Sequence, residues 1–394
     1  MSSFFKETFI VILLILLMWS EEAYAGSTST NGVAARAQSM QNAFTAVADD
    51  PSAIFYNPAG LTQVDGSELL VGVSMMFIDM DYTNSESGIS SSSTEKVFPA
   101  SLFLSTNIIK AISLGFGIYS PFARKSNYSP NMAVGNMNHS SELLRLDFVP
   151  TVAIDIGQYV SVGLGFVGSI IDLESDVLGF LETGDGYGYT GQGGILIKPH
   201  DRFKVGLNYR GPMNADIEGS GTLIGVGRDD FSATIKFPAV LSLGFAWDYS
   251  EFFLVALSVD WEMWSHINEI RRKYTNPAHQ MAGLTILNSE DSYNIRFGMI
   301  FKPQDFSEIR AGYSYLTAAV PADSIIPAQP DYDGHAFSIG YSRSFDYLRV
   351  DLGYEFDYIP TRSSNSFLFP GDYENKVHSI QIGVSFKFGN LART

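Results

Sequence analysis

SIQIGVSFKF, at residues 379–388, alternates apolar and polar side chains from end to end. Because successive side chains of a β-strand point to opposite faces, this pattern predicts a strand with one apolar face and one polar face. LRVDLGYEFDY, at residues 348–358, repeats the pattern, and so do residues 293–302, 203–210 and 144–156. The chain is therefore predicted to be all-β.

Alternation alone does not choose between a soluble sandwich, which buries the apolar face, and a membrane barrel, which turns that face to lipid. Alternating stretches of about ten residues recur along the chain, which suits tilted strands that cross a bilayer. Aromatic residues gather near strand ends, as at Trp247 and Tyr249, in the manner of interfacial girdles. Charged residues make up only 17% of the chain, against about 25% in soluble domains. We predict a transmembrane antiparallel β-barrel of about 14 strands, from near Glu68 to Phe388.

Residues 1–25 have the layout of a secretory signal peptide. Lys6 precedes an apolar run from Phe9 to Trp19, which at 11 residues is too short for a membrane helix, and Ala23-Tyr24-Ala25 is a small-x-small cleavage site. We expect cleavage after Ala25. The predicted location is the outer membrane of a Gram-negative bacterium, with outer-membrane lipid and the outer-membrane assembly machinery as partners.

Composition argues against several kinds of site. The chain has no cysteine and a formal net charge of −17, which disfavour a disulfide scaffold, a cysteine metal site and a nucleic-acid partner. The six histidines lack metal-ligand spacing, so no metal and no cofactor are expected. A GxGxxG pattern at Gly163, Gly165 and Gly168 lies inside an alternating stretch with no helix after it. We interpret these glycines as lumen-facing strand residues and not as a nucleotide loop.

Residues 26–63 do not alternate and hold no long strand. They are rich in small residues, and turn signals stand at Asp49–Ser52 and Asn57–Gly60. A compact, weakly amphipathic segment ahead of a barrel is best placed inside the lumen as a plug. The predicted organisation is a signal peptide at 1–25, a hatch at 26–63, a barrel at 64–388 and a C-terminal tail at 389–394.

Two runs carry a family resemblance. GVAARA at residues 32–37 and AFTAVADDPSAIFYNPAGL at residues 43–61 resemble the N-terminal hatch of the FadL/TodX family of outer-membrane fatty-acid and aromatic-hydrocarbon transporters. Weaker echoes, which extend the resemblance over nearly the whole mature chain, are at residues 117–122, 184–189, 204–210 and 310–315. The chain departs from the family pattern where Gln41-Asn42 replace two glycines and where Ala123 replaces the glycine of Pro-Phe-Gly.

The resemblance implies a fourteen-stranded barrel with a hatch at the periplasmic side, an external groove for first capture and a lateral gap in the wall. It implies that Asn57, Pro58 and Ala59 are hatch or gating residues. It also implies an inward kink that faces this tripeptide on the strand from Ala111 to Phe122. The candidate residues of the lateral opening are Gly115, Gly117 and Pro121, and the candidate substrate-lining residues are Phe44, Phe55, Tyr56 and Phe122.

Arginines on the polar faces of strands have two interpretations. Arg145, Arg296 and Arg310 are candidates for a charge network that fills the lumen and holds the plug, which is the usual role of buried charges. The alternative is contact with the carboxylate of a substrate, because arginine binds carboxylates bidentately.

The expected function is passive uptake of hydrophobic small molecules, by capture in an apolar site, hatch rearrangement and lateral exit through the wall. No enzyme activity is expected. A structural or shuttle protein on the same barrel stays open as an alternative, and a barrel-embedded lipid enzyme is a further one. The enzyme would need a serine with a histidine, and His335 with Ser338 or His378 with Ser379 are the pairs to consider.

Overall fold

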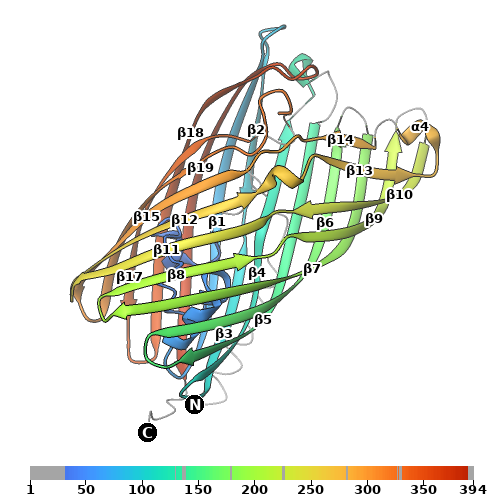
Figure 1. Cartoon of the computed structure of the whole chain (residues 1–394). Helices are drawn as coiled ribbons and strands as arrows, with labels where there is room; N and C mark the ends of the chain where they lie inside the picture. The colour runs from blue at the N-terminus through green and yellow to red at the C-terminus, as the bar shows by residue number, and fades with distance from the viewer. Residues whose placement is uncertain are drawn as a thin grey trace, which may run out of the picture.

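The computed structural model describes residues 32–128, 130–134, 139–177, 180–223, 227–280, 283–325, 327 and 331–388. The expected signal peptide, its cleavage site and the tail at 389–394 lie outside these residues. Most of the described chain forms one antiparallel sheet that closes on itself as a barrel (Figure 1). The closure joins β1 (Ser67–Asn84) to β19 (Gly371–Phe388), which are paired along their whole length.

Within the described residues, the sheet contains 19 strand segments. Five pairs of consecutive segments each form one interrupted wall strand, so the wall has 14 strands. In chain order between β1 and β19 they are β2 with β3 (Ser90–Val97, Ala100–Ile109), β4 (Ile112–Tyr128), β5 (His139–Ile156), β6 (Val160–Val177), β7 (Phe180–His200), β8 with β9 (Phe203–Arg210, Met213–Leu223), β10 with β11 (Gly227–Phe237, Ala239–Ser250), β12 with β13 (Phe253–Met263, Glu269–Tyr274), β14 with β15 (Leu284–Ile286, Ser292–Gln304), β16 (Ser307–Leu316), β17 (Gly334–Ser344) and β18 (Leu348–Ser364). The predicted fourteen-stranded barrel is confirmed.

Three of the five interruptions coincide with proline. Pro99 separates β2 from β3, Pro212 lies between β8 and β9, and Pro238 lies between β10 and β11. Proline has no backbone N–H to donate to the neighbouring strand, so the ladder stops there although the chain continues in the same direction.

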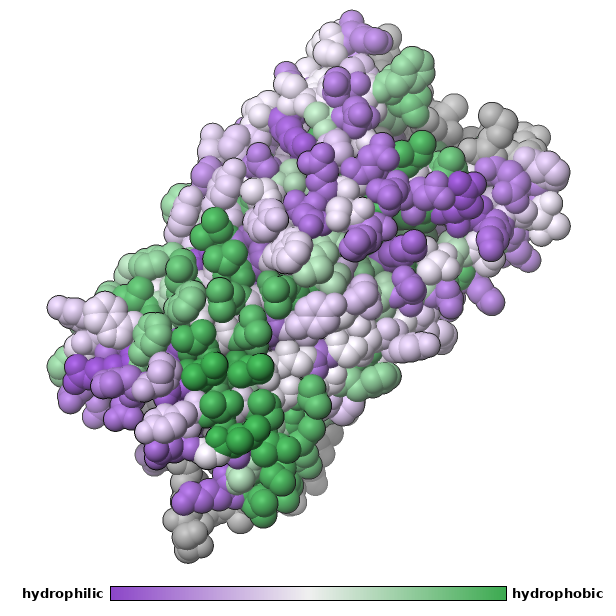
Figure 2. Space-filling model, viewed as in Figure 1, coloured by the Kyte–Doolittle hydropathy of each residue, from purple (hydrophilic) through white to green (hydrophobic). Residues whose placement is uncertain are grey.

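On the face shown in Figure 2, apolar side chains (green) gather over the lower half of the barrel and form part of an apolar belt, while the upper half is mostly purple. Exposed members of the belt come from strands all around the wall and include Leu114, Phe116, Ile154, Leu164, Phe166, Ile195, Leu243, Leu257, Ile295, Ile339, Leu352 and Ile380. Such a belt suits a wall that faces lipid. Among the described residues, no helix is long and apolar enough to cross a membrane.

The polarity of the wall inverts beyond the belt. In β9, Met213, Ala215 and Ile217 face inward and are buried, while Asn214 and Asp216 between them are exposed. Further apolar residues on the inner face of the upper wall are Met76, Ile78, Met80, Ile171, Leu173, Phe231, Ile235 and Phe237. A strand that leaves lipid for water must turn its polar face outward, and alternation then turns its apolar face inward. The upper lumen is therefore apolar, whereas barrel interiors are usually polar.

Residues 32–64, called the luminal segment below, lie inside the barrel (Figure 1, blue). This segment contains two single-turn helices, α2 (Ala35–Gln38) and α3 (Ala53–Tyr56), and the 3₁₀ helix η1 (Pro58–Gln63). Its apolar side chains form one buried cluster with residues of the wall. The remaining short helices, η2 (Met132–Val134), η3 (Trp264–His266) and α4 (Pro277–Gln280), lie between strands.

Candidate functional site

The luminal segment is shaped by tight turns. Gln41, Asn42 and Ala48 have positive φ angles of 50°, 59° and 33°, in the left-handed region that glycine adopts most easily. The backbone N–H of Gln41 donates to Ser338 Oγ at 3.2 Å, and the Tyr56 hydroxyl donates to Asn42 Oδ1 at 2.6 Å. These bonds hold the turn at the two positions where the resembled family carries glycines.

Paired glycines on the wall allow the luminal backbone to approach closely. Gly163 of β6 is paired with Gly194 of β7, and a β-carbon on either residue would collide with Pro58 or Asn57. Three further pairs, which meet Thr45, Met40 and Ser39 respectively, are Gly206 with Gly244, Gly298 with Gly312, and Gly340 with Gly353. The absence of side chains at these wall positions forms a seat for the luminal segment. Gly163 thus serves close packing, as its interpretation as a lumen-facing residue predicts.

The Asn57-Pro58-Ala59 tripeptide lies against β6 and β7. Asn57 Nδ2 donates to the carbonyl oxygens of Thr45 at 2.9 Å and Ile195 at 3.1 Å. Its Oδ1 accepts from the Ala59 N–H at 3.2 Å, so Asn57 caps η1, which begins with Pro58. One asparagine therefore fixes both the local turn and its attachment to the wall.

The side chains of Ile54 and Leu61 pack against the expected opening in β4. Both side chains lie beside Gly115, and Ile54 also lies beside Gly117. The hydrogen bonds of Asn57 reach β7, and η1, which begins with Pro58, also approaches β4. The expected contact between the tripeptide and residues 115–121 therefore stays a prediction.

The ladder of β4 is disturbed at Pro121, one of the residues expected at the opening. Gly115 and Gly117 are still paired with β3 on one side and β5 on the other. Between Tyr119 and Phe122 the register with β5 shifts, as in a β-bulge. The disturbance thus begins after the two glycines.

Beyond Tyr119, β4 is paired with β5 alone. In the part of the chain that the structure describes, β4 and β2 share no ladder pairs, and the N–H of Asn127 donates to Ser93 Oγ at 2.9 Å across this boundary. The wall between β2 and the upper part of β4 is therefore held by side chains more than by backbone.

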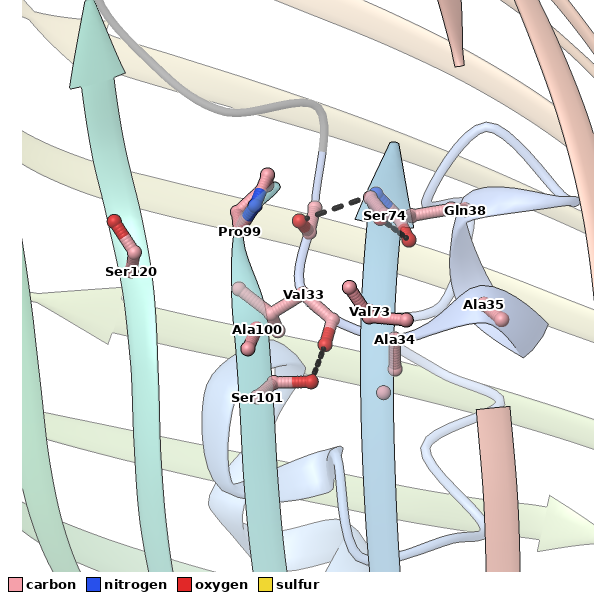
Figure 3. Close-up of a pocket in the computed structure, with 12 residues that line it drawn as sticks. Val33, Ala34, Ala35, Gln38, Val73, Ser74, Pro99, Ala100, Ser101 and Ser120 are labelled. Carbon is pink, nitrogen blue, oxygen red and sulfur yellow. Dashed lines mark hydrogen bonds between the residues drawn. The ribbon is translucent and has the colours of Figure 1, made fainter. Parts of the chain in front are cut away.

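The start of the luminal segment lies beside this boundary (Figure 3). Val33 lies between β1 and β3, where Ser101 Oγ donates to its carbonyl oxygen, and Ser74 Oγ donates to Gln38 Oε1 at 3.0 Å. Ser120 of β4 lines the same small cavity, which at about 10 Å³ has room for about one water molecule. The luminal segment thus covers the inner side of the wall here.

A second interruption lies between β5 and β6. Phe148 is paired with Gly168 and Thr151 with Gly165, but the two residues between, which include Pro150, have no partner in β6. Pro150 lacks the N–H that the ladder requires. On the outer face, a mainly apolar groove of about 480 Å³ is lined by Pro150, Thr151, Val152, Leu164, Gly165 and Phe166.

An ion network anchors the other side of the luminal segment. Arg36 is 4% exposed and pairs with Asp49, with Asp50 at 3.5 Å and with Glu308 of β16 at 3.0 Å. Burial alone would lower the pKa of Arg36, but these three carboxylates outweigh it and raise that pKa. Burial would raise the pKa of Asp49, but Arg36 holds it below its ordinary value. Asp50 also pairs with Arg349 of β18 at 3.4 Å.

The network continues along the wall through Arg310, a candidate substrate contact. Its Nε donates to Ser39 Oγ at 2.7 Å, and its Nη1 lies 3.1 Å from Glu308 and 3.2 Å from Asp351. Asp351 also pairs with Arg349 at 2.9 Å. Arg310 is fully buried between carboxylates, so its surroundings suit a structural anchor.

The other two candidate arginines are also paired. Arg145 makes two hydrogen bonds to Asp147, at 2.7 and 2.9 Å, and its guanidinium lies over the rings of Phe122 and Phe237. Arg296 pairs with Asp260. The side chains of these arginines are already engaged by carboxylates.

The candidate aromatic residues divide into two kinds. Phe44 and Tyr56 are buried against each other inside the luminal segment, with ring centroids 5.4 Å apart. Phe55 is only partly buried and packs edge-to-face on Tyr119, at 5.2 Å between centroids. Phe122 is also partly buried and contacts two of the apolar clusters of the upper lumen. Phe55 and Phe122 are therefore the better placed of the four to meet a ligand.

Arg210 lies at the end of β8, and the sequence pattern predicts only that it lies on the polar face of a strand. Its guanidinium lies over the Phe55 ring, 4.4 Å from the centroid. It donates to Gln192 Oε1 at 3.2 Å and to the Phe55 carbonyl oxygen at 3.2 Å. The contact with Phe55 joins residues far apart in the sequence, so strand periodicity alone does not predict it.

The two serine–histidine pairs do not meet. Ser338 is buried on the inner face and accepts from Gln41 N, whereas His335 contacts the Tyr313 hydroxyl at 2.9 Å. His378 likewise contacts the Tyr354 hydroxyl at 2.8 Å, away from the buried neighbouring serine.

Comparisons with known proteins agree with this architecture. The model of a family described as outer membrane protein transport protein (OMPP1/FadL/TodX) matches residues 16–178 and 174–388. The long-chain fatty acid transport protein of Salmonella typhi is 21% identical over 430 residues, which cover 96% of each chain. A FadL homologue of Pseudomonas aeruginosa superposes with a TM-score of 0.77 at 15% identity, over 93% of this chain and 100% of its own. The toluene transporter TodX of Pseudomonas putida gives 0.71 at 17% identity, over 91% and 99%.

Proposed function

This chain belongs to the outer membrane protein transport family (OMPP1/FadL/TodX), and from that premise we propose that it takes up hydrophobic small molecules such as long-chain fatty acids or aromatic hydrocarbons. It is a β-barrel of the Gram-negative outer membrane, and its relatives are transporters and not enzymes. The proposed uptake is passive and needs no cofactor.

The observation that carries this proposal is the apolar inner face of the upper lumen. One buried cluster there joins Ile171, Ile217, Phe231 and Tyr274. Phe122 packs against it and also against the neighbouring cluster of Trp264, Ile267, Leu287 and Ala319. Burying apolar surface contributes about 25 cal/mol per Å², so a hydrophobic solute gains by leaving water for such a lining.

The luminal segment would act as the hatch, with one fixed side and one movable side. The fixed side carries Arg36 and Asp50, whose ion pairs reach β16 and β18. The movable side carries Ile54 and Leu61, which contact β4 through apolar packing. Apolar contacts are non-directional, so an incoming apolar ligand can replace them more readily than it can replace buried ion pairs.

The proposed exit is lateral, through the wall around Gly115 and Gly117. Gly115, Thr151 and Gly165 are direct neighbours across β4, β5 and β6. Ile54 covers Gly115 from inside, and the apolar groove beside Pro150 lies on the outer face one strand away. A hydrophobic solute that leaves through the barrel wall enters lipid without crossing water. The bulge at Pro121 would supply the looseness that the wall needs to open.

Uptake in a host that lacks its own long-chain fatty acid transporter tests the function. We expect cells that display this protein to take up radiolabelled oleate or toluene faster than cells with an empty vector. The control for general leakiness of the outer membrane is a barrel of unrelated function. It is expressed at the same level, and its heat-modifiable migration shows that it is folded. If the folded protein accelerates uptake of neither compound, the proposed function is wrong.

A further inference from the structure

Arg210 differs from five other arginines that reach the luminal segment or the inner wall. Arg36, Arg145, Arg296, Arg310 and Arg349 each have a carboxylate within 4.0 Å. Among the described residues, no carboxylate lies within that distance of Arg210. This difference arises in a chain with 42 acidic residues, so a shortage of acids does not explain it.

The donors of Arg210 are only partly used. Nε and Nη2 share the amide oxygen of Gln192, at 3.3 and 3.2 Å, and Nη2 also donates to the Phe55 carbonyl oxygen. The hydroxyl of Tyr119 lies 3.5 Å from Nη2. Nη1 donates to none of the described residues. Neutral acceptors thus hold the guanidinium in place without neutralising its charge.

The surroundings of Arg210 suit an amphipathic molecule. The rings of Phe55 and Tyr119 pack edge-to-face beside the guanidinium, and Phe103 stacks on Tyr119 with centroids 5.4 Å apart. The charged guanidinium can contact an anionic headgroup, and the adjacent aromatic rings can contact an apolar chain. Arginine binds a carboxylate through two parallel N–H bonds, which are stronger than bonds between neutral groups.

We propose that Arg210 binds the carboxylate of the transported molecule, so that the cargo held beside Phe55 is a fatty acid or another hydrophobic carboxylate and not a neutral hydrocarbon. This inference rests on the proposed uptake function and names its substrate class. Arg210 is paired with Gln192 across β7 and β8, and Gln192 is paired in turn with Gly165. The headgroup would therefore be held two strands from the groove beside Pro150, next to the proposed exit.

Binding of two matched ligands to the purified protein in a neutral detergent tests the proposal. Dodecanoate carries the carboxylate, and methyl dodecanoate has the same chain without the charge. We expect Arg210→Gln to weaken dodecanoate binding at least about tenfold, which is about 1.4 kcal/mol, and to leave methyl dodecanoate binding unchanged. Arg210→Lys should restore part of the loss, because it keeps the charge but not the fork. Arg202→Gln, in the exposed turn between β7 and β8, is the matched control and should change neither.

The possible outcomes separate this inference from the function on which it rests. Equal weakening of both ligands by Arg210→Gln would show a brace for Phe55 and overturn the carboxylate site. Unchanged binding of both ligands would overturn it as well. In either case the wild-type protein still binds hydrophobic ligands, and the proposed function stands. If the wild-type protein binds neither ligand and accelerates no uptake, the proposed function itself fails.

Discussion

The side-chain oxygen of Asn57 occupies the space that a β-carbon on Gly194 would need. The same asparagine donates to the next carbonyl along β7, that of Ile195. The tripeptide of residues 57–59 is therefore seated against a strand more than a hundred residues away, and the seat exists because the wall residue has no side chain.

Gly194→Ala should unseat the tripeptide. The added methyl group would collide with Asn57 and with Pro58, whose Cδ lies 2.8 Å from the new atom. Overpacking of this kind typically costs about 1–3 kcal/mol. We expect severalfold faster proteolysis of the luminal segment in the folded barrel. Gly191→Ala on the same strand is the control, because its nearest neighbour is 4.0 Å away; equal proteolysis of the two variants would contradict the seat.

Arg36→Gln should loosen the anchored side of the luminal segment. It removes the cation that compensates Asp49, Asp50 and Glu308, and a buried pair that loses one partner typically costs about 3–5 kcal/mol. The expected result is a lower midpoint in the heat-modifiable migration of the barrel. Arg271→Gln breaks an exposed pair with Glu269, for which about 0–1 kcal/mol is expected. A midpoint that falls equally in both variants would rule out the anchor.

The anchor should also depend on pH through Asp49. Its pKa in the folded protein is below the ordinary 3.8, because Arg36 outweighs the effect of burial. A carboxyl group with a lowered pKa stabilises the folded state above its ordinary pKa, and that stabilisation is lost as pH falls through the folded value. The protection of the luminal amide hydrogens, measured against the intrinsic exchange rate at each pH, should therefore stay high at neutral and mildly acidic pH and fall only below 3.8. In Asp49→Asn the protection should already be lower at neutral pH, and this acid step should be smaller; an unchanged step would assign it to another group.

Much of the wall could be predicted from the sequence because strand alternation is a local property. Residues 348–358 illustrate this, since Asp351 and Glu355 are buried in the lumen while Leu352 and Tyr354 are exposed, as the two-residue period requires. The stretches 83–94 and 271–291, by contrast, look like polar loops in sequence. The structure places strand residues in both, because the wall beyond the lipid presents polar side chains outward.

The contacts of the luminal segment could not be predicted in the same way. The positions at which Asn57 and Ile54 contact the wall depend on turns with positive φ at Gln41, Asn42 and Ala48. A positive φ can be predicted at glycine but not at these residue types. The paired glycines were visible as glycines, but their pairing requires the register of the strands. Arg210 stands out only when the ion pairs of the other arginines are known.

The last prediction concerns the exit. Cysteines at positions 54 and 117, introduced as Ile54→Cys with Gly117→Cys, should form a disulfide, because a β-carbon at Gly117 would lie 3.1 Å from Ile54 Cγ2 and bonded cysteines need Cβ atoms about 3.5–4.5 Å apart. The natural chain has no cysteine, so this bond would be the sole disulfide. Oxidation should stop uptake by holding α3 over the wall at Gly115, and reduction should restore it.

A wall-only lock distinguishes hatch movement from general stiffening of the barrel. Ser67→Cys with Thr106→Cys would join β1 to β3, where the two hydroxyls lie 2.7 Å apart and the residues are ladder partners. That bond leaves the luminal segment free, so uptake should continue under oxidising conditions. If the disulfide between positions 54 and 117 forms fully and uptake is as fast as in the reduced protein, the ligand does not pass between the luminal segment and β4. The exit would then have to lie elsewhere in the wall, and the groove beside Pro150 could be tested next by Pro150→Val, which restores the missing N–H of the ladder.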